Sequence, residues 1–161
     1  MKQKTAKILI LLPVSWWGYR MIKKYALTDE QKEIDLMART MYGEARGEGE
    51  NGMQAVANVI MNRVNAGAWY GRTVEEVVKK PRQFSCWNDG DPNKKVIETV
   101  NSGNSIFARA LQIAKNAYYG KIQDLTLGAT HYHAANIVPT WAGDLIQTIK
   151  IGSHVFYKEV L

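Results

Sequence analysis

The sequence predicts a mainly α-helical domain that ends in a small β element. Apolar residues recur three and four positions apart in several stretches between residues 29 and 119, which is the period of an amphipathic helix. Segments that begin at Thr28 and Thr73 have the form of helix capping boxes. After Gly128 the helical period disappears, and short runs rich in β-branched and aromatic residues indicate strands.

The pattern assigns an order to these elements. Thr28, Thr73 and Ser105 stand where helix N-caps are expected, and Gly or Pro follows the end of each apolar stripe. We therefore expect helices over about residues 29–46, 52–66, 74–80 and 105–119. The polar stretch 82–101 contains Asn-Asp-Gly-Asp-Pro and is predicted to be a loop. Strands are expected at residues 148–151 and 154–157, around a Gly-Ser turn.

Length and charge limit the classes of function. The 161 residues suffice for one domain. The net charge of +6 lies entirely in residues 1–24, because the 15 basic residues that follow balance all 15 acidic ones. A nucleic-acid-binding protein would have its basic patch on the folded domain, so we expect no nucleic-acid partner. The single cysteine, Cys86, excludes an internal disulfide and a multi-cysteine metal site.

Residues 1–24 form a basic and apolar N-terminal segment, distinct from the domain predicted over residues 25–161. Three lysines precede an uncharged run over residues 8–19. As a helix this run would be about 18 Å long, too short for a bilayer core of about 30 Å. The pattern favours an export signal or a segment that contacts the membrane transiently; an arm packed on the domain or disordered is the alternative.

Two carboxyl groups near the end of the first helix are candidates for acid–base catalysis. Glu44 continues the apolar stripe of Ile34, Met37 and Met41. Loss of water disfavours the anion, so a carboxyl there can keep a proton and act as a general acid. Glu48 lies one turn further on the same side if the helix persists. The alternative for Glu44 is a buried ion pair with a nearby arginine, namely Arg39, Arg46 or Arg63.

The stretch from residue 83 to residue 87 has side chains suited to binding a sugar. Hydroxyl and amide groups alternate there with aromatic rings, and a sugar ring presents hydroxyls at its edge and C–H groups on its face. The candidates are Gln83, Phe84, Ser85 and Trp87. Alternatively, Phe84 and Trp87 only attach the loop to the core. Cys86 has no neighbouring group in sequence that would activate it as a nucleophile.

Histidines and asparagines supply further candidates. On a strand, His131 and His133 would point to one face, and three histidines with a carboxylate can ligate zinc, although the spacing of a zinc protease motif is absent. We expect this region to line a substrate cleft through His131, Tyr132, His133, Trp141 and His154; the alternative is that the histidines are structural hydrogen-bonding side chains. Asn58 and Asn62 lie one turn apart on a core-packed helix, where they would bond substrate or the acid-bearing segment, or else face solvent.

Several blocks of sequence together resemble a known family. They are Tyr-Gly-Glu-Ala-Arg-Gly-Glu over residues 42–48, Ala-Val-Ala-Asn-Val-Ile-Met-Asn-Arg over residues 55–63, Gln-Phe-Ser over residues 83–85 and Gly-Ser-His-Val-Phe-Tyr over residues 152–157. In this order they resemble the cell-wall hydrolases typified by the spore cortex-lytic enzyme SleB. The resemblance covers about residues 32–157.

The resemblance implies a lysozyme-like helical fold related to goose lysozyme, and cleavage of the MurNAc–GlcNAc glycan strands of peptidoglycan without a cofactor. It implies that Glu44 is the catalytic acid, in a lytic transglycosylase that leaves 1,6-anhydro-MurNAc ends. A muramidase would use water and commonly a second carboxylate, for which Glu48 is the candidate. Competing hypotheses are a metal-dependent amidase or peptidase and a non-catalytic wall-binding module.

The small size and the basic N-terminus are similar to phage endolysins. From that likeness we expect a monomer that is exported to the periplasm or cell wall and lyses cells.

Overall fold

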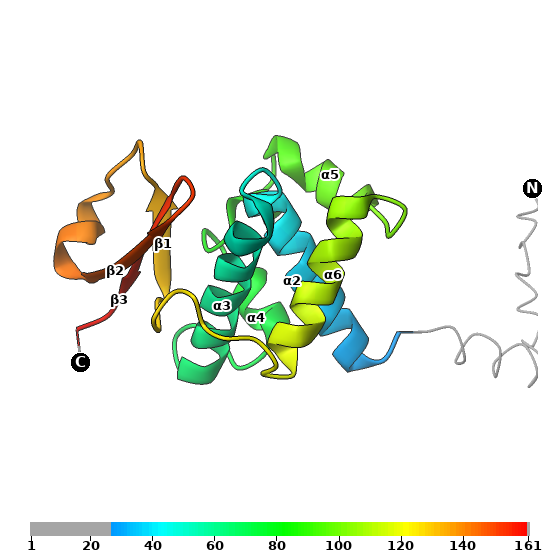
Figure 1. The fold of residues 1–161 in the computed structure, drawn as a ribbon, viewed down its shortest axis with the longest axis horizontal. Helices are drawn as coiled ribbons and strands as arrows, with labels where there is room; N and C mark the ends of the chain where they lie inside the picture. The colour runs from blue at the N-terminus through cyan, green and yellow to red at the C-terminus, as the bar shows by residue number, and fades with distance from the viewer. Residues whose placement is uncertain (1–26, 161) are drawn as a thin grey trace, which may run out of the picture.

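The computed structural model describes residues 27–160, which form a helical body with a small sheet at one end (Figure 1). Residues 1–24, for which we expect a signal or membrane-associating role, lie outside the described residues. The longer helices are α2 (Asp29–Ala45), α3 (Gly49–Ala66) and α6 (Ser105–Tyr118), and the shorter ones are α4 (Val74–Val78) and α5 (Pro92–Thr99). Two 3₁₀ turns are η1 (Ser85–Trp87) and η2 (Thr140–Asp144).

Helix α2 is the central element of the body, because α3, α4, α5 and α6 all pack against it. Its start is fixed by the predicted capping box, in which the backbone N–H of Gln31 donates to the Thr28 hydroxyl at 3.1 Å and the Thr28 N–H donates to the Gln31 side chain at 2.9 Å. Met37 and Met41 are fully buried in the main core. The predicted apolar stripe therefore faces the core of the helical body. The C-terminal end of α2 lies at the top of this body in Figure 1.

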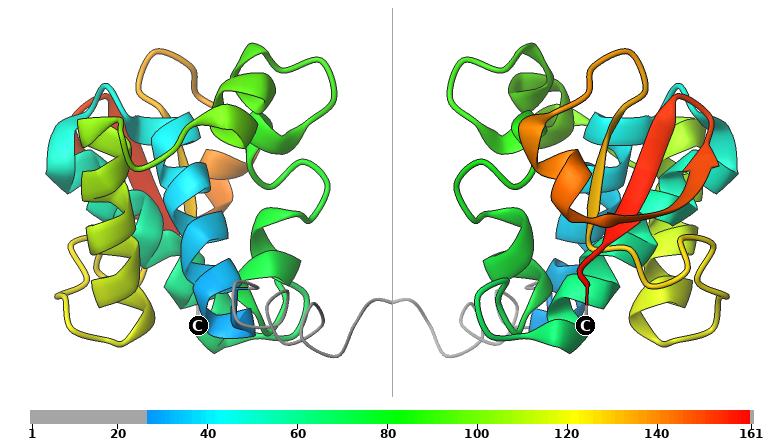
Figure 2. Two further views of the ribbon diagram at one scale, coloured as in Figure 1. Left: turned by 90° about the vertical axis from the view of Figure 1, so that its right-hand side faces the viewer. Right: turned by 90° about the vertical axis from the view of Figure 1, so that its left-hand side faces the viewer.

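The sheet is antiparallel and has the order β1-β3-β2. Its strands are β1 (His131–Ala134), β2 (Ile146–Ile151) and β3 (His154–Lys158). The turn between β2 and β3 contains Gly152 and Ser153, as predicted, and in the β1–β3 pair Tyr132 stands opposite Phe156. Phe156 packs on α3 in a second, smaller core. The sheet thus covers one end of the helical body, as the right-hand view of Figure 2 shows.

The largest difference from the sequence prediction lies in residues 82–101, which we expected to be a loop. The structure has η1 and α5 there. The Asp91 side chain accepts the N–H of Asn93, and Pro92 occupies the first turn of α5, a combination that favours the start of a helix. The same Asp-Pro pair is also a turn signal, which is why sequence reasoning missed the helix.

Smaller differences concern helix starts and strands. Helix α3 begins at Gly49 rather than near residue 52, and α6 is capped by Asn104 rather than by Ser105. The chain also forms β1, which joins the two predicted strands. Within residues 27–160, none of the helices combines the length and the apolar character that crossing a bilayer requires.

Gly52 marks a close contact at the junction of α2 and α3. It is buried within α3, where glycine is normally about 1 kcal/mol less favourable than alanine. A Cβ atom at this position would lie 2.2 Å from the Cβ of Glu48. The junction therefore has no room for a side chain at residue 52.

We predict that Gly52→Ala lowers the melting temperature of the full chain, although alanine is the better helix former. The expected loss is about 1–3 kcal/mol, as for other overpacked sites, and thermal unfolding followed by circular dichroism measures it. Gly47→Ala is the matched control, because a Cβ atom there meets nothing within 4 Å. An unchanged or raised melting temperature for Gly52→Ala would contradict this account of the junction.

Candidate active site

The carboxyl group of Glu44 lies in the last turn of α2 and is held by neutral donors. Its Oε1 accepts the backbone N–H of Cys86 at 3.1 Å and, more weakly, the Ser85 hydroxyl at 3.4 Å. Its Oε2 accepts the hydroxyl of Tyr132 at 3.1 Å. Within residues 27–160 no lysine or arginine forms an ion pair with it. The partly buried carboxyl is therefore fixed in place without the ion pair that was the alternative for this residue.

Gly43 allows the loop that carries the Cys86 N–H to approach α2. A Cβ atom at position 43 would lie 2.7 Å from the Cβ and 2.9 Å from the Sγ of Cys86, closer than packed carbon atoms come. The Gly-Glu pair thus has a structural reason: the glycine admits the loop, and the next residue receives the hydrogen bond. The Cys86 side chain is fully buried, and burial with the nearby Glu44 carboxylate raises the pKa of its thiol, so it is unsuited to be a nucleophile.

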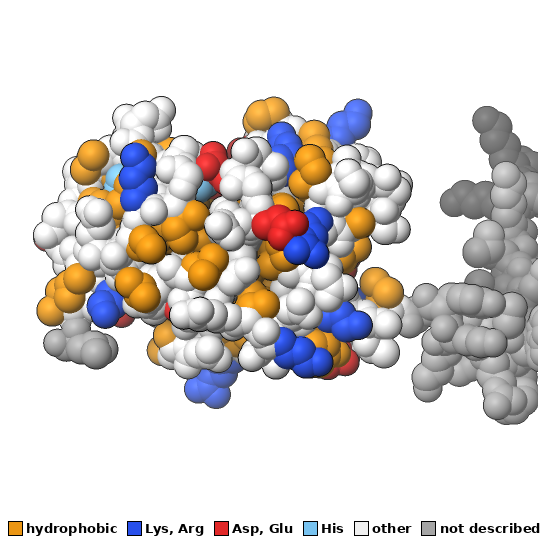
Figure 3. Space-filling view, in the orientation of Figure 1, with side chains coloured by type: hydrophobic (Ala, Val, Ile, Leu, Met, Phe, Trp, Pro, Cys, Tyr) orange, Lys and Arg blue, Asp and Glu red, His pale blue; other side chains and the backbone are white. Residues whose placement is uncertain are grey.

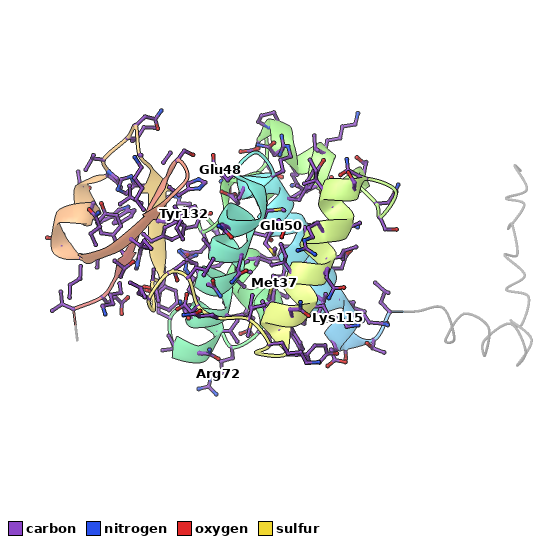
Figure 4. The ribbon with its side chains drawn as sticks, viewed as in Figure 1. Met37, Glu48, Glu50, Arg72, Lys115 and Tyr132 are labelled. Atoms are coloured by element: carbon purple, nitrogen blue, oxygen red, sulfur yellow. The ribbon has the colours of Figure 1, made fainter. Side chains whose placement is uncertain are left out.

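Tyr132 brings the sheet to Glu44. It lies on β1, and its ring faces the helical body (Figure 4). There it contacts Phe84, in the loop before η1, and it also packs against Phe156 of the neighbouring strand β3. Burial, and next the Glu44 carboxylate, raise the pKa of its hydroxyl well above the ordinary value. Tyr132 therefore stays protonated and can donate to Glu44 at neutral pH. The His154 ring packs edge-on against it at 5.2 Å between centroids.

Arg63, on α3, contacts both of the segments that supply hydrogen bonds to Glu44. Its Nε donates to the carbonyl of Thr130 at 2.7 Å, and its guanidinium lies over the rings of Phe84 and Tyr70, at 5.0 and 5.6 Å from their centroids. The Arg63 side chain thus joins α3 to the two segments that hold Glu44. Phe84, which sequence reasoning placed in the substrate site, is 1% exposed and belongs to the core.

Glu48 does not extend α2, which ends at Ala45. It occupies the N-cap position of α3, and both of its carboxylate oxygens accept hydrogen bonds from Ser153 in the β2–β3 turn. These bonds lower the pKa of Glu48. Figure 4 labels Glu48 where the hairpin turn meets the top of the helices.

The space next to Glu44 is a pocket of about 280 Å³. It is lined by residues 43–48, at the end of α2 and the turn after it, and by Asn93. Arg46 reaches across to Asn93, donating to its side chain at 2.8 Å. In the space-filling view an acidic side chain lies in a notch between the sheet and the helices, where Figure 4 labels Glu48 (Figure 3). Basic side chains are spread over this face rather than gathered in one patch.

Two other predicted residues of the 83–87 stretch lie at the edge of this site. Trp87 donates its indole N–H to the hydroxyl of Thr40 on α2 at 2.9 Å, and the Lys79 ammonium lies 3.3 Å from its ring centroid. Gln83 is partly exposed at the start of the loop. Both therefore belong to the loop that holds Glu44, and neither forms a hydrogen bond with the carboxyl, whose donors are Ser85, Cys86 and Tyr132.

The structure does not bring His131, His133 and Trp141 to Glu44. Alternate residues of a strand point to opposite faces, and Tyr132 between the two histidines faces the helices. Both histidines pack against Trp141 on the outer face of the sheet, and His133 bonds the hydroxyl of Tyr157. Within residues 27–160 no group of three or more His, Cys, Asp and Glu side chains is placed to hold a metal ion.

Asn58 and Asn62 hold a loop instead of facing the site. The Asn58 side chain accepts the N–H of Leu125 at 3.1 Å. The Asn62 amide donates to the Ala129 carbonyl at 2.9 Å and to Asp124 at 3.1 Å. These bonds attach residues 124–129 to α3 just before β1 begins. Neither solvent exposure nor contact with the acid-bearing segment, two of the three expectations for them, describes their position. The third, binding of substrate by Asn58 and Asn62, stays a prediction.

Sequence reasoning missed Gly43, the N–H of Cys86 and Ser153, and it considered Arg63 only as an ion-pair partner of Glu44. A glycine directly before a candidate catalytic carboxyl is a usable signal for close approach. A backbone donor has no signature in the sequence, and the partners of Arg63 and Glu48 are set by tertiary contacts.

The fold and the site place the chain in a known class of proteins. A family model described as Cell Wall Hydrolase matches residues 47–157. This chain belongs to the cell wall hydrolase family. Glu44 lies just before the matched range.

Among its relatives are spore cortex-lytic enzymes. The enzyme of Oceanobacillus iheyensis is 35% identical over 140 residues, which cover 80% of this chain and 42% of that protein. The enzyme of Bacillus cereus is 34% identical over 131 residues, which cover 80% of this chain and 45% of that protein. The chain thus spans less than half the length of these relatives.

Two solved structures are similar to this one. The crystal structure of the catalytic domain of Bacillus cereus SleB matches with a TM-score of 0.64 and 33% identity, over 83% of this chain and 94% of that one. The catalytic domain of the germination-specific lytic transglycosylase SleB from Bacillus anthracis matches with a TM-score of 0.64 and 32% identity, over 83% and 98% of the two chains. The predicted fold class, a mainly helical lysozyme-like domain with a small C-terminal sheet, is confirmed.

We predict that Gly43→Ala exposes the cysteine behind Glu44. The added Cβ atom pushes the 85–87 loop away from α2, at a cost of about 1–3 kcal/mol. Because the chain has one cysteine, the rate of its reaction with a thiol-specific disulfide reagent reports this displacement directly.

The reaction should be about tenfold faster or more in Gly43→Ala than in the parent. Lowering the free energy of opening the 85–87 loop by about 1.4 kcal/mol makes the open state ten times more populated. Gly47→Ala serves as the control and should react like the parent. If the thiol of Gly43→Ala stays as protected as before, the close approach at Gly43 does not hold the loop.

Proposed function

We propose that the chain cleaves the MurNAc–GlcNAc glycan strands of peptidoglycan as a lytic transglycosylase, with Glu44 as the group that transfers the proton. The observation that carries the proposal is the carboxyl of Glu44, fixed beside a pocket by neutral donors and without an ion-pair partner among residues 27–160. The similar proteins, which include a lytic transglycosylase, support the same substrate class.

In this mechanism a single carboxyl acts twice. Protonated Glu44 first gives its proton to the glycosidic oxygen, so that the bond from that oxygen to C1 of the muramic acid residue breaks. The 6-hydroxyl of the same residue then bonds to C1, and its proton returns to the Glu44 carboxylate. The products are a strand with a 1,6-anhydro end and a strand with a new 4-hydroxyl, and no water is consumed.

The hydrogen bonds to Glu44 suit this double role. The Cys86 N–H fixes one oxygen, and the Tyr132 hydroxyl fixes the other, so the carboxyl keeps its position while its charge changes. Such preorganised donors stabilise the carboxylate that forms when the proton leaves, without reorganisation of the site.

We predict that Glu44→Gln abolishes lysis while the protein stays folded. Glutamine keeps the shape and the acceptor oxygen but has no proton to transfer, and a positioned general acid typically contributes about 10²–10⁴-fold in rate. The assay incubates the full chain with purified peptidoglycan and identifies the released fragments by mass spectrometry. The parent should release 1,6-anhydro-muropeptides.

Glu98→Gln, an exposed acid on α5, is the matched control and should keep the parental rate. A folded Glu44→Gln protein with a rate within tenfold of the parent would contradict the role of Glu44. Fragments with ordinary reducing ends would identify a water-using muramidase, and released peptides or amino sugars with free lactyl groups would identify an amidase or peptidase.

For residues 1–24 we propose transient membrane contact and export to the periplasm or cell wall, where an endolysin would meet its substrate. The support is the concentration of the whole net charge in this segment, next to an uncharged apolar run.

We predict that deletion of residues 2–24 leaves the rate on purified peptidoglycan within about threefold of the parent, because the hydrogen bonds that hold Glu44 come from residues 85, 86 and 132. The same deletion should abolish lysis when the protein is expressed inside cells. Turbidity of the culture and of a peptidoglycan suspension measure the two effects. A loss on purified peptidoglycan as large as that of Glu44→Gln would contradict this separation of roles.

A further inference from the structure

The contact between Glu48 and Ser153 joins the helices to the sheet across 105 residues of sequence. The Ser153 N–H donates to Oε2 of Glu48 at 2.9 Å, and the Ser153 hydroxyl donates to Oε1 at 2.6 Å. Hydrogen bonds to an ionised carboxylate are about twice as strong as neutral ones. The contact occupies both oxygens of Glu48 with donors from one residue.

Two glycines make room for this contact. A Cβ atom at Gly152 would lie 2.1 Å from Oε2 of Glu48, and one at Gly52 would overlap the Glu48 Cβ atom. Gly152 also has a positive φ of 56°, so its turn needs glycine in any case. Gly52 has no such need, because it lies in a regular helix. Its presence therefore points to the space that Glu48 requires.

The strand that follows Ser153 is the middle one of the sheet. β3 pairs with β1 so that His154 stands opposite Ala134 and Phe156 opposite Tyr132. The carbonyl of Ser153 also accepts the N–H of Ala135 at 2.7 Å, directly after β1. A shift of the turn thus moves β1, and with it the Tyr132 hydroxyl that bonds Glu44.

We propose that Glu48 is a positioning residue, which fastens the β2–β3 turn to the α2–α3 junction and so holds Tyr132 against Glu44. The two bonds from Ser153 favour the ionised form of Glu48, so at the pH where the enzyme would work it holds no proton to give to a glycosidic oxygen. This inference rests on the proposed role of Glu44, and it replaces the expectation that Glu48 shares the catalysis.

The test compares Glu48→Gln, Ser153→Ala and the double variant in the full chain, with Glu50→Gln as the matched control. Glu50 is an exposed acid two residues further on, paired with Arg109. Each chain is measured for melting temperature and for the rate of fragment release from peptidoglycan as a function of pH.

We expect Glu48→Gln and Ser153→Ala each to lower the melting temperature and to reduce the rate about tenfold, as for the loss of a hydrogen bond to a charged group. The double variant should lose less than the sum of the two single losses, because both changes weaken the same contact. Ser153→Ala removes the bond from the hydroxyl and leaves the backbone N–H, whereas Glu48→Gln removes the charge to which both donors bond. The pH–rate profile should keep its shape, since Glu44 still transfers the proton. Ser153→Thr keeps the backbone N–H and a side-chain hydroxyl, so this variant should retain the parental rate.

Three results would overturn the proposal. The first is a loss in Glu48→Gln as complete as in Glu44→Gln, together with a near-parental rate in Ser153→Ala, which would make Glu48 an acid or base. The second is an additive effect of the two changes on the melting temperature. The third is no effect of either change. If the parent chain released no glycan fragments, the proposed function would fail, while the melting temperatures would still decide whether the contact exists.

Discussion

The rest of the site depends on the contacts of one buried side chain, that of Arg63, with the Thr130 carbonyl and two aromatic rings. Its side chain is 5% exposed, and burial lowers its pKa. A charge removed from water is costly unless other groups compensate for it. Here the Thr130 carbonyl and the faces of Phe84 and Tyr70 compensate, and a cation over an aromatic ring is worth up to about 2 kcal/mol when it is desolvated.

The groups that compensate the Arg63 charge also determine where the hydrogen-bond donors of Glu44 lie. Phe84 directly precedes the two residues that bond Oε1 of Glu44, and Thr130 lies two residues before the tyrosine that bonds Oε2. Arg63 itself belongs to α3, which packs against α2. One side chain thus fixes a helix, a loop and a strand relative to the helix that carries the carboxyl. The Nη1 atom of Arg63 has no hydrogen-bond partner among the described residues, so its position depends on packing rather than on a full set of bonds.

Local patterns made most of the helical fold predictable, and they also located Glu44. The stripe on α2 and the capping box at Thr28 are properties of neighbouring residues, so they can be seen in the sequence. Helix α5 was not predicted, because Asp91-Pro92 can begin either a turn or a helix. Only the packing of Ile97 in the core decides between the two.

The candidate site was less predictable, since its groups meet only through the tertiary structure. The alternation along β1 correctly puts His131 and His133 on one face, but nothing local says which face meets the helices. That choice follows from Phe156 on the paired strand, which packs on α3. In the same way, the partner of Glu48 lies in a turn 105 residues away, and no period in the sequence relates the two.

The two cores of the molecule differ in size, and this has a consequence for how the protein responds to heat. The main core joins the five helices, whereas the second consists of Ala55, Val59, Ala129 and Phe156 with a few partly buried neighbours. Proteins open first where few apolar contacts hold a segment. We therefore expect that on heating the sheet detaches before the helices unfold, and that the Tyr132 hydroxyl leaves Glu44 with it.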